Sequence, residues 1–405
     1  MSLHETVFGD RVHIGFFGRR NAGKSSVVNA VAGQNLAVVS GVPGTTTDPV
    51  QKAMELLPMG PVLIIDTPGI DDEGALGALR VQKTRQVLNK TDVAVLVVDA
   101  TVGKSAADEE LIALFREQGI PFLVAYNKCD LLFGQPETPE GERAVFLSAR
   151  HRINIDVLKE SIAALSAPEE ARPIVGDLLQ RGDLAVLVTP IDSAAPKGRL
   201  ILPQQQTIRD VLDSGACAVV VKETELSHIL SCLAQKPRIV ITDSQAFAQV
   251  AAVVPKDISL TSFSILFARH KGDLAQAVRG AAALESMQDG DTILISEGCT
   301  HHRQCDDIGS VKLPHWIRAH TGKELHFAFT SGMEFPEDLS PYRLIVHCGG
   351  CMLNPRQMRY RQKCAAAQGI PMTNYGVLIA HMQGILPRTL VPFPAAAAAL
   401  TAGRA

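Results

Sequence analysis

The stretch VHIGFFGRRNAGKSSVVNAVAG, residues 12–33, decides the fold of the first third of the chain. Its pattern predicts an apolar strand, a loop that starts at Gly18, and a helix that begins after Gly23. In this context G-x-x-x-x-G-K-S forms a phosphate-binding loop, because glycines let backbone N–H groups wrap the phosphates and the helix N-terminus adds its positive end. Lys24 would then reach the β- and γ-phosphates, and the Ser25 hydroxyl would bind Mg²⁺.

Two later strands end in residues that suit a guanine nucleotide. VLIIDTPG brings Asp66, which is placed to hold Mg²⁺ through water, and Gly69, whose N–H can bind the γ-phosphate. PFLVAYNKCD brings Asp130, whose carboxylate can accept both N–H groups of a guanine edge, whereas adenine presents a different donor pattern. The candidate nucleotide ligands are Gly18, Asn21, Ala22, Gly23, Lys24, Ser25, Ser26, Asp66, Gly69, Asn127, Lys128, Asp130, Ser148 and Ala149.

Over residues 11–165 these motifs resemble GTPases of the translation-factor-related class, most of all their tRNA-modification and Era-like branch. The resemblance implies that PGTTTDP, residues 43–49, is the first switch and that Thr46 binds Mg²⁺. It also implies that Lys24, Thr46 and Gly69 form the catalytic set. The expected activity is hydrolysis of GTP to GDP and phosphate.

Two positions bear on the rate of this hydrolysis. Ile70 stands where Ras-like enzymes place the residue that orients water, so we expect the intrinsic rate to be slow. Asn21 occupies the loop position that coordinates K⁺ in potassium-activated relatives, where the ion places positive charge between the phosphates. We expect K⁺ stimulation on this basis, and the alternative is that Asn21 only shapes the loop.

Composition and charge exclude several classes of protein. The chain has 405 residues, of which 46% are hydrophobic and 20% charged, and this suits two or three soluble domains. A net charge of −3 does not favour nucleic acid or an anionic membrane as a partner. The N-terminus lacks a signal-peptide layout, and no apolar run approaches the roughly 20 residues of a transmembrane helix. The sequence therefore predicts a cytoplasmic protein.

The middle third alternates short apolar runs with segments of helical spacing. LAVLVTPID, ACAVVVKE, RIVITDS and SFSILFA are the apolar runs, and their alternation with helices predicts a covered parallel sheet. No catalytic constellation stands out, so we expect a surface for self-association and interpret Cys217 and Cys232 as packing residues. The predicted fold class is α/β, with a P-loop GTPase domain over residues 1–170 and two open parallel-sheet domains over residues 171–270 and 271–405.

The last third carries most of the cysteines, and histidines accompany them. DTILISEGCTHH predicts a strand that ends in a turn with Cys299 and His301. YRLIVHCGGC predicts a second strand that ends in His347, Cys348 and Cys351. Because ligands gather at the carboxyl ends of the strands in open α/β sheets, we expect both groups to form one site.

Three kinds of site are open for these side chains. A redox C-x-x-C should open a helix after the first strand of a thioredoxin-like unit, and this pair comes late in the chain. A structural zinc site has four ligands, which the three cysteines and either His301 or His347 could supply. A [4Fe–4S] cluster on Cys299, Cys348 and Cys351 leaves one iron without a cysteine, which suits an external ligand or a second metal unit.

A GTPase domain followed by C-x-H and H-C-x-x-C resembles, along essentially the whole chain, the HydF family of [FeFe]-hydrogenase maturation GTPases. The resemblance implies a dimerisation domain at 171–270 and an iron–sulfur domain at 271–405. Cys299, Cys348 and Cys351 would bind the cluster, with the two motif histidines as further candidate ligands. The implied cofactors are GTP, Mg²⁺, a [4Fe–4S] cluster and K⁺.

The resemblance also implies partners and a task. Two radical-SAM maturases would help to assemble a diiron precursor on the scaffold, which would pass it to the hydrogenase apoprotein and would itself form a homodimer. The alternative function is an Era- or TrmE-like ribosome- or tRNA-associated GTPase with a structural zinc site. That alternative needs a basic RNA-binding surface, which the composition does not show.

Overall fold

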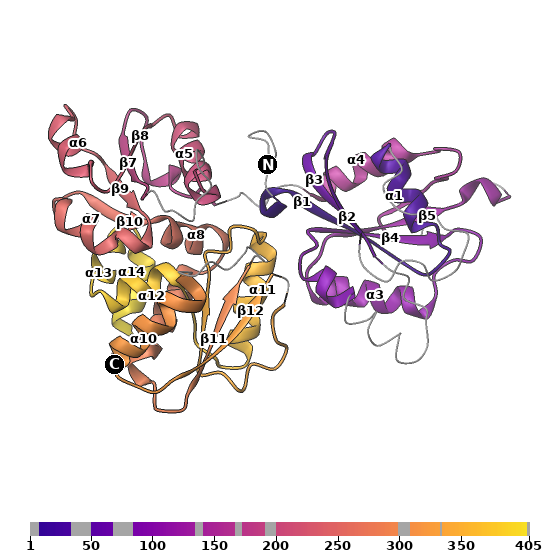
Figure 1. The fold of residues 1–405 in the computed structure, drawn as a ribbon. Coiled ribbons are helices and arrows are strands. Elements are labelled where there is room, and N and C mark those ends of the chain that lie inside the picture. The colour runs from indigo at the N-terminus through magenta and orange to yellow at the C-terminus, as the bar shows by residue number, and fades with distance from the viewer. Residues whose placement is uncertain are drawn as a thin grey trace. The chain divides into compact units, whose positions relative to one another are not determined.

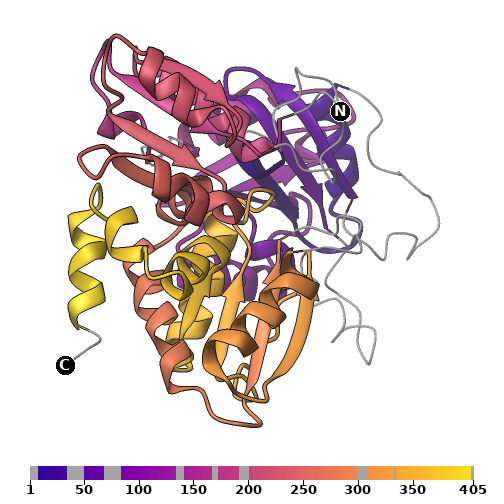
Figure 2. The same ribbon diagram turned by 60° about the vertical axis from the view of Figure 1, so that its left-hand side comes forward.

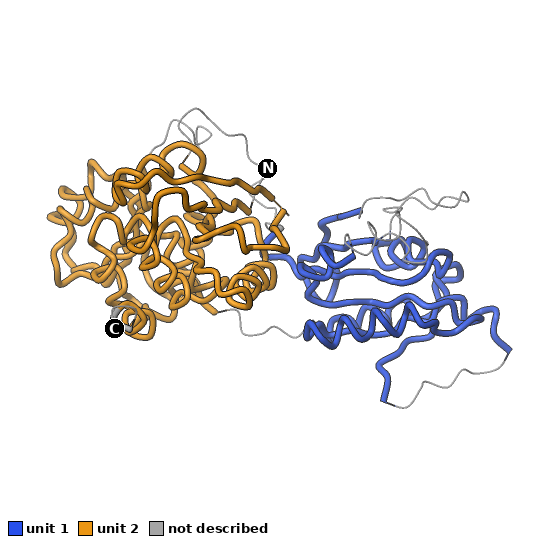
Figure 3. Tube along the Cα trace, turned by 90° about the horizontal axis from the view of Figure 1, so that it is seen from below, with its two compact units in different colours: residues 1–170 blue, residues 171–405 orange. Residues whose placement is uncertain are grey.

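The computed structural model describes residues 8–33, 50–67, 84–133, 141–166, 172–190, 200–298, 308–332 and 334–402. Its contacts divide the chain into two compact units, residues 1–170 and 171–405 (Figure 3). The described residues form three sheets with helices packed on them, which confirms the predicted α/β fold class (Figures 1 and 2). Among the described helices, none has the length and the apolar character that crossing a bilayer would need.

A six-stranded sheet forms the middle of the first unit, in the order β2-β3-β1-β4-β5-β6. Its strands are β1 (Val12–Phe17), β2 (Val50–Leu56), β3 (Gly60–Asp66), β4 (Val93–Asp99), β5 (Phe122–Asn127) and β6 (Ala144–Phe146). All neighbouring pairs are parallel except β2 with β3. The segments that follow β1, β3 and β5 therefore leave the sheet at the same edge, where the predicted nucleotide residues lie.

Helices cover both faces of this sheet, because successive strand residues point to opposite sides. The helical segments are η1 (Phe8–Asp10), α1 (Lys24–Ala32), residues 84–88, α3 (Ala106–Glu117), η2 (Cys129–Leu131) and α4 (Ile155–Leu165). Ile14 and Phe16 of β1 join the core under α1 and α4. Phe17 faces the other way and packs on Phe115 of α3, with ring centroids 5.3 Å apart.

Two four-stranded parallel sheets form the second unit, in the orders β10-β9-β7-β8 and β12-β11-β13-β14. The first consists of β7 (Leu184–Val188), β8 (Cys217–Val221), β9 (Ile239–Thr242) and β10 (Ser259–Ser262). The second consists of β11 (Thr292–Glu297), β12 (His326–Ser331), β13 (Leu344–His347) and β14 (Met372–Asn374). Both are open parallel sheets, as predicted, while the domain boundary near residue 270 stays a prediction.

One hydrophobic core runs from the first of these sheets to the second. The helical segments are η3 (Gly176–Leu178), α5 (Leu202–Asp213), α6 (Leu226–Cys232), η4 (Ser244–Ala246), α7 (Phe247–Val253), α8 (Phe263–Lys271), α9 (Leu274–Ala282), η5 (Ala283–Ser286), η6 (Ile308–Lys312), α10 (Leu313–Thr321), α11 (Pro355–Ala367), α12 (Tyr375–Met382), α13 (Leu386–Thr389) and α14 (Pro394–Ala402). A Cβ on Gly280 would lie 2.2 Å from the carbonyl oxygen of Met372, so glycine lets α9 approach β14. Arg388 of α13 donates to the carbonyls of Ala251 and Val254 at 2.7 and 2.6 Å, which joins the two halves.

β8 is an edge strand, and its side chains are only partly covered. Cys217 and Val220 on this strand are exposed, and so is Cys232 at the end of α6. The prediction that Cys217 and Cys232 are packing residues is therefore wrong. A short continuous apolar run reads the same for a covered and an uncovered strand, which is why the sequence did not show the difference.

Candidate functional site

The phosphate-binding loop follows β1 and requires glycine at two positions. Gly18 has φ +136° and Gly23, directly before α1, has φ +88°, which are angles that residues with a Cβ rarely adopt. A Cβ on Gly18 would lie 2.2 Å from the carbonyl oxygen of Val97, and one on Gly23 would lie 2.3 Å from Nδ2 of Asn127. The loop thus lies tightly against β4 and the end of β5.

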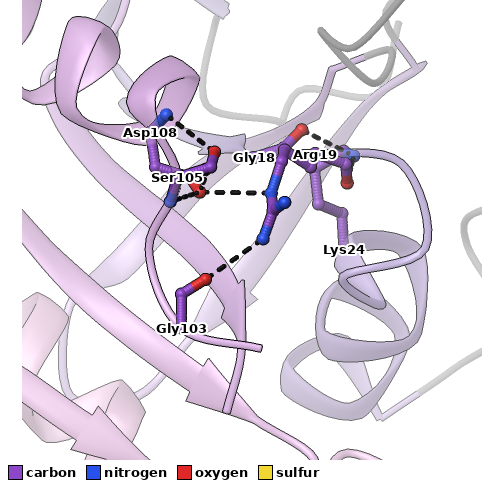
Figure 4. Close-up of polar contacts among 6 residues, drawn as sticks. All are labelled: Gly18, Arg19, Lys24, Gly103, Ser105 and Asp108. Carbon is purple, nitrogen blue, oxygen red and sulfur yellow. Dashed lines mark hydrogen bonds and ion pairs between the residues drawn. The ribbon is translucent and has the colours of Figure 1, made fainter. Parts of the chain in front are cut away.

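Lys24, the first residue of α1, is only 8% exposed and turns back into the loop (Figure 4). Its Nζ donates to the carbonyl oxygens of Gly18 at 2.9 Å and Arg19 at 2.7 Å. An ammonium in this place can bind phosphate oxygens, and the two carbonyls are the partners that it would exchange for them.

Arg19 ties the loop to the start of α3 (Figure 4). Its Nε lies 3.2 Å from Oδ2 of Asp108, and its Nη2 donates to the carbonyl oxygen of Gly103 at 3.1 Å. Asp108 is 1% exposed and also accepts from the hydroxyl and N–H of Ser105, at 2.8 and 2.9 Å, in a capping box. Sequence reasoning missed this anchor, because the loop motif carries no mark of a partner on a distant helix.

Ser25 and Asp66 meet at the end of β3. The Ser25 hydroxyl donates to Oδ2 of Asp66 at 2.7 Å. The other carboxylate oxygen, Oδ1, is buried and has no hydrogen-bond partner among the described residues. Burial raises the pKa of Asp66, so the site disfavours the carboxylate charge in the absence of a cation. A buried carboxylate oxygen beside a hydroxyl fits Mg²⁺, which prefers oxygen ligands.

Asn127, at the end of β5, connects the phosphate loop with the turn after β6. Its Nδ2 donates to the carbonyl oxygen of Ala22 at 3.0 Å, and its Oδ1 accepts from the N–H of Ala149 at 3.0 Å. The next residue, Lys128, has φ +67° and forms an ion pair with Asp99. These contacts position both parts of the site from one strand end.

Asp130 and Ser148, which are predicted to contact the base, lie close together after β5 and β6. A hydrogen bond from the Ser148 side chain lowers the pKa of Asp130, which keeps its carboxylate ionised at neutral pH. A cavity of about 760 Å³ opens beside them, within the roughly 300–1,000 Å³ of small-molecule sites. The predicted nucleotide residues that line it are Gly23, Ser26, Asn127, Lys128, Asp130, Ser148 and Ala149.

For three further predicted residues, the structure does not test the predicted role. Asn21 is exposed and has φ +63°, a left-handed conformation that asparagine tolerates, which supports a loop-shaping role and leaves K⁺ binding a prediction. Thr46 and Gly69 lie outside the described residues.

The second candidate site is the cysteine turn, residues 348–354, which follows β13 at the carboxyl edge of its sheet. The Sγ of Cys348 accepts from the N–H of Gly298 at 3.0 Å and from the N–H of Gly350 at 3.4 Å. Gly298 follows the neighbouring strand β11, so two strand ends meet at this sulfur. Cys351 lies half-buried in the same turn. N–H donors to sulfur stabilise the thiolate and tune metal centres.

Lys271, the last residue of α8, holds the cysteine turn from within the protein. Its side chain is 2% exposed, and Nζ donates to the carbonyl oxygens of Gly350 at 3.3 Å, Cys351 at 2.9 Å and Leu353 at 2.9 Å. These bonds satisfy three carbonyls and place a positive charge beside the cysteines. Sequence reasoning missed this residue, because a lysine in the last turn of a helix is common for electrostatic reasons alone.

His347 and Arg361 are buried beside the turn. Nδ1 of His347 lies 2.7 Å from the carbonyl oxygen of Cys348, and its Nε2 lies 2.8 Å from Nη1 of Arg361. Since a guanidinium only donates, Nε2 accepts and Nδ1 carries the proton. Burial, followed by the Arg361 charge, lowers the pKa of His347 to about 3. A metal ion on His347 would have to displace one of these two partners.

The structure brings together two of the three predicted cysteine ligands, Cys348 and Cys351. Cys299 and His301 lie outside the described residues. The described part of the site has two thiols, N–H groups that donate to sulfur and the buried ammonium of Lys271. This donor set fits a metal centre with thiolate ligands.

Three family models match successive parts of the chain. Residues 13–128 match a family model described as a 50S ribosome-binding GTPase. Residues 174–272 match the hydrogen maturase F dimerization domain, and residues 275–392 match the hydrogen maturase F tetramerization domain. The two maturase models together cover more than half of the chain.

Several curated GTPases resemble part of the chain. A tRNA modification GTPase MnmE of Nitratidesulfovibrio vulgaris is 32% identical over 216 residues, 51% of this chain and 46% of that protein. A GTPase Der of Kosmotoga olearia is 34% identical over 128 residues, 30% of this chain and 29% of that protein. The crystal structure of Aquifex aeolicus Era bound to GDP and aluminium fluoride is 21% identical, covers 52% of this chain and 93% of that one, and gives a TM-score of 0.35. The chain thus spans less than half the length of these curated relatives.

Proposed function

The chain belongs to the hydrogen maturase F family of GTPases in hydrogenase maturation, and from this premise we propose that it is a scaffold and carrier for [FeFe]-hydrogenase. In this proposal it binds a [4Fe–4S] cluster with one exchangeable position and delivers a diiron precursor to the hydrogenase apoprotein. The observation that carries the proposal is the cysteine turn at the carboxyl edge of a parallel sheet, in a chain whose first unit has a guanine-nucleotide site.

Cys299, Cys348 and Cys351 are the proposed cluster ligands, and His301 and His347 are the candidates for the fourth position. When bound, the cluster supplies an iron that no cysteine holds, to which an external ligand can attach. Two thiolates in a turn between two strand ends support this assignment, as do the N–H donors to the Cys348 sulfur.

Two positively charged residues beside the cysteine turn compensate the negative charge of its thiolates. Lys271 binds three carbonyls of the turn and contributes a fixed positive charge. Arg361 adds a second one, and its Nη1 and Nη2 also donate to the Ser296 hydroxyl at 3.2 Å and the Gly332 carbonyl at 2.7 Å. The pair positions the cysteine turn and stabilises thiolates that would otherwise be costly to bury.

In the nucleotide site we assign each role to a residue of the chain. Lys24 exchanges the carbonyls of Gly18 and Arg19 for phosphate oxygens, and Ser25 and Asp66 hold Mg²⁺ together with Thr46. Asp130 selects guanine. K⁺ beside Asn21 adds positive charge and stimulates a slow hydrolysis.

Nucleotide state then controls the docking of partners. The γ-phosphate is present only in the GTP form, so contacts from Thr46 and Gly69 to it distinguish the two states. We infer that this difference changes the affinity for the hydrogenase apoprotein and for two radical-SAM maturases. Hydrolysis sets the timing of cluster delivery, and it does not drive the cluster chemistry. Equal partner affinity and equal delivery in the GTP and GDP forms would refute the coupling.

A second copy of the chain is the proposed partner of residues 174–272. The match to a dimerization domain and the uncovered edge strand β8 support this assignment. Val220→Lys places a charge on the exposed side of β8 and should shift the assembly toward smaller species in sedimentation velocity. Val253→Lys is the matched control, because Val253 is similarly exposed on α7 of the same domain. Equal sedimentation of both variants would argue against an interface at β8.

The cluster proposal is tested by anaerobic purification, iron and zinc analysis, and electron paramagnetic resonance after reduction. We expect iron and a cluster signal in the wild type, and loss of both in Cys348→Ser. Cys364→Ser is the matched control, because Cys364 lies on α11 outside the site and should keep both. About one zinc per chain with no resonance signal would overturn the proposal in favour of an Era-like GTPase with a structural zinc site.

A further inference from the structure

Glu285, His320 and His381 converge on one point of the surface of the second unit. Nε2 of His320 and Nε2 of His381 each lie 2.9 Å from the same carboxylate oxygen, Oε1 of Glu285. The two imidazole rings are 6.2 Å apart between centroids. The three residues come from η5, α10 and α12, so the fold, and not local sequence, brings them together.

This cluster lies at the opposite edge of the sheet from the cysteine turn. η5 precedes β11, α10 ends directly before β12, and α12 runs away from the carboxyl end of β14, so all three reach the amino edge. The cysteine turn follows the carboxyl end of β13. Since a six-residue strand such as β11 spans about 20 Å, the two groups of side chains are separate.

Two imidazoles and a carboxylate form a common ligand set for zinc. The donor atoms all lie within 4.8 Å of one another. Bonds of about 2.0–2.1 Å to a tetrahedral Zn²⁺ would place them roughly 3.3 Å apart, so the present 2.9 Å contacts need to open only slightly. We propose that Glu285, His320 and His381 form a second metal site, which binds one Zn²⁺ through Oε1 and both Nε2 atoms, with the proton of each neutral imidazole moved to Nδ1.

The surroundings suit an ion that exchanges with solvent. The side chains of Glu285, His320 and His381 are 60%, 26% and 14% exposed, so an ion can enter and one coordination position stays open to water. Three protein ligands leave a fourth position for water, whereas structural zinc has four protein ligands.

A bound ion would link η5, α10 and α12, which all lie in the region that matches the tetramerization model, residues 275–392. Any ion that binds the folded form and not the unfolded chain raises the unfolding temperature. Trp316, the single tryptophan of the chain, lies on α10 with His320, so its fluorescence reports the unfolding of this region. The inference does not rest on the proposed cluster at the cysteine turn.

The first experiment compares zinc uptake by the untagged full-length chain and by single variants. Each protein is dialysed against Zn²⁺ and analysed for bound metal, and zinc on the cysteines cancels because all variants keep them. We expect His320→Ala and His381→Ala to bind about one Zn²⁺ fewer than the wild type, and to lose the zinc-dependent rise in the Trp316 unfolding temperature. His315 is an exposed histidine on α10, the helix of His320. His315→Ala should therefore bind as much zinc as the wild type and show the same rise in unfolding temperature.

Equal uptake and equal thermal shifts in all four proteins would overturn the proposal and leave a hydrogen-bonded cluster. If a variant fails to fold, the absorption spectrum of Co²⁺ bound to the wild type tests the site instead. Cobalt bound by nitrogen and oxygen shows ligand-field bands without the strong sulfur charge-transfer absorption of thiolate-bound cobalt. One equivalent of such cobalt in addition to the thiolate-bound ion supports the site, and thiolate-bound cobalt alone refutes it.

Discussion

Each of the two candidate sites contains a buried lysine that donates to backbone carbonyls of a turn. Lys24 binds two carbonyls of the phosphate loop from the first residue of a helix, and Lys271 binds three carbonyls of the cysteine turn from the last residue of a helix. A phosphate offers Lys24 better partners than carbonyls do. Lys271 already uses three donors, so it has no comparable alternative. We infer that Lys24 exchanges its carbonyl partners for phosphate when nucleotide binds, whereas Lys271 keeps its carbonyl partners and stabilises the cysteine turn.

Replacement of Lys24 tests the first half of this comparison and should have the largest effect. Lys24→Met removes a charge that acts on the transferring phosphate, and loss of one such group typically costs about 100- to 1,000-fold in rate. We expect a fall of this size in single-turnover GTP hydrolysis, and a loss of about 1–3 kcal/mol in the unfolding free energy of the nucleotide-free protein, because two loop carbonyls lose their donor. A large loss of stability with a nearly normal rate of hydrolysis would show that Lys24 is mainly structural.

Lys271→Met tests the second half and should lower stability without slowing hydrolysis. Buried carbonyls that lose their donor cost about 1–3 kcal/mol, and partial relaxation of the turn limits the total to about 3 kcal/mol. This loss should appear in urea unfolding followed by Trp316 fluorescence, together with a lower iron content. GTP hydrolysis should not change.

Lys363→Met is the matched control for this variant, because Lys363 is an exposed lysine on α11. It should leave both the Trp316 transition and the iron content as they are in the wild type. If Lys271→Met unfolded like Lys363→Met, the three bonds to the turn would contribute nothing measurable, and the contrast between the two lysines would fail.

The comparison also separates what sequence could predict from what it could not. Gly18, Lys24 and Asp66 occur at fixed positions relative to a strand end, so a local pattern is enough to predict where they lie. Alternating apolar runs likewise predicted the parallel sheet of the middle third. The exposure of β8 depends on which strand ends the sheet, and the run that contains Val220 carries no sign of it.

Contacts between distant segments had no signal in the sequence. Lys271 lies 80 residues before Cys351, and the pairing depends on how α8 crosses the end of β13. His320 and His381 meet Glu285 only because η5, α10 and α12 finish at the same edge. Such groups can be found once the topology is known, since they share an edge and not a spacing.

Arg19 tests whether the phosphate loop, like the cysteine turn, needs an anchor. Arg19→Met leaves the buried carboxylate of Asp108 with its Ser105 partners but without its ion pair. Because the Arg19 side chain is 26% exposed, solvent reduces the loss to about 1–2 kcal/mol. We expect this loss in a transition seen by circular dichroism without a change in Trp316 fluorescence, with GTP affinity several-fold weaker. Arg143→Met, at an exposed arginine of the same unit, should change neither.

Lys104 shows the opposite limit, a lysine with two carboxylate partners that is not deeply buried. Its Nζ lies 2.8 Å from Oε2 of Glu142 and 3.0 Å from Oε1 of Glu109, and the bond to Glu142 raises its pKa above the ordinary value. Ion pairs with this much solvent around them contribute about 0–1 kcal/mol. Lys104→Met should therefore lower the free energy of unfolding of the first unit by less than 1 kcal/mol, and raised salt should reduce even that difference. A loss as large as that of Lys271→Met would mean that charge pairing, and not the burial of lysine against backbone carbonyls, governs the stability of both units.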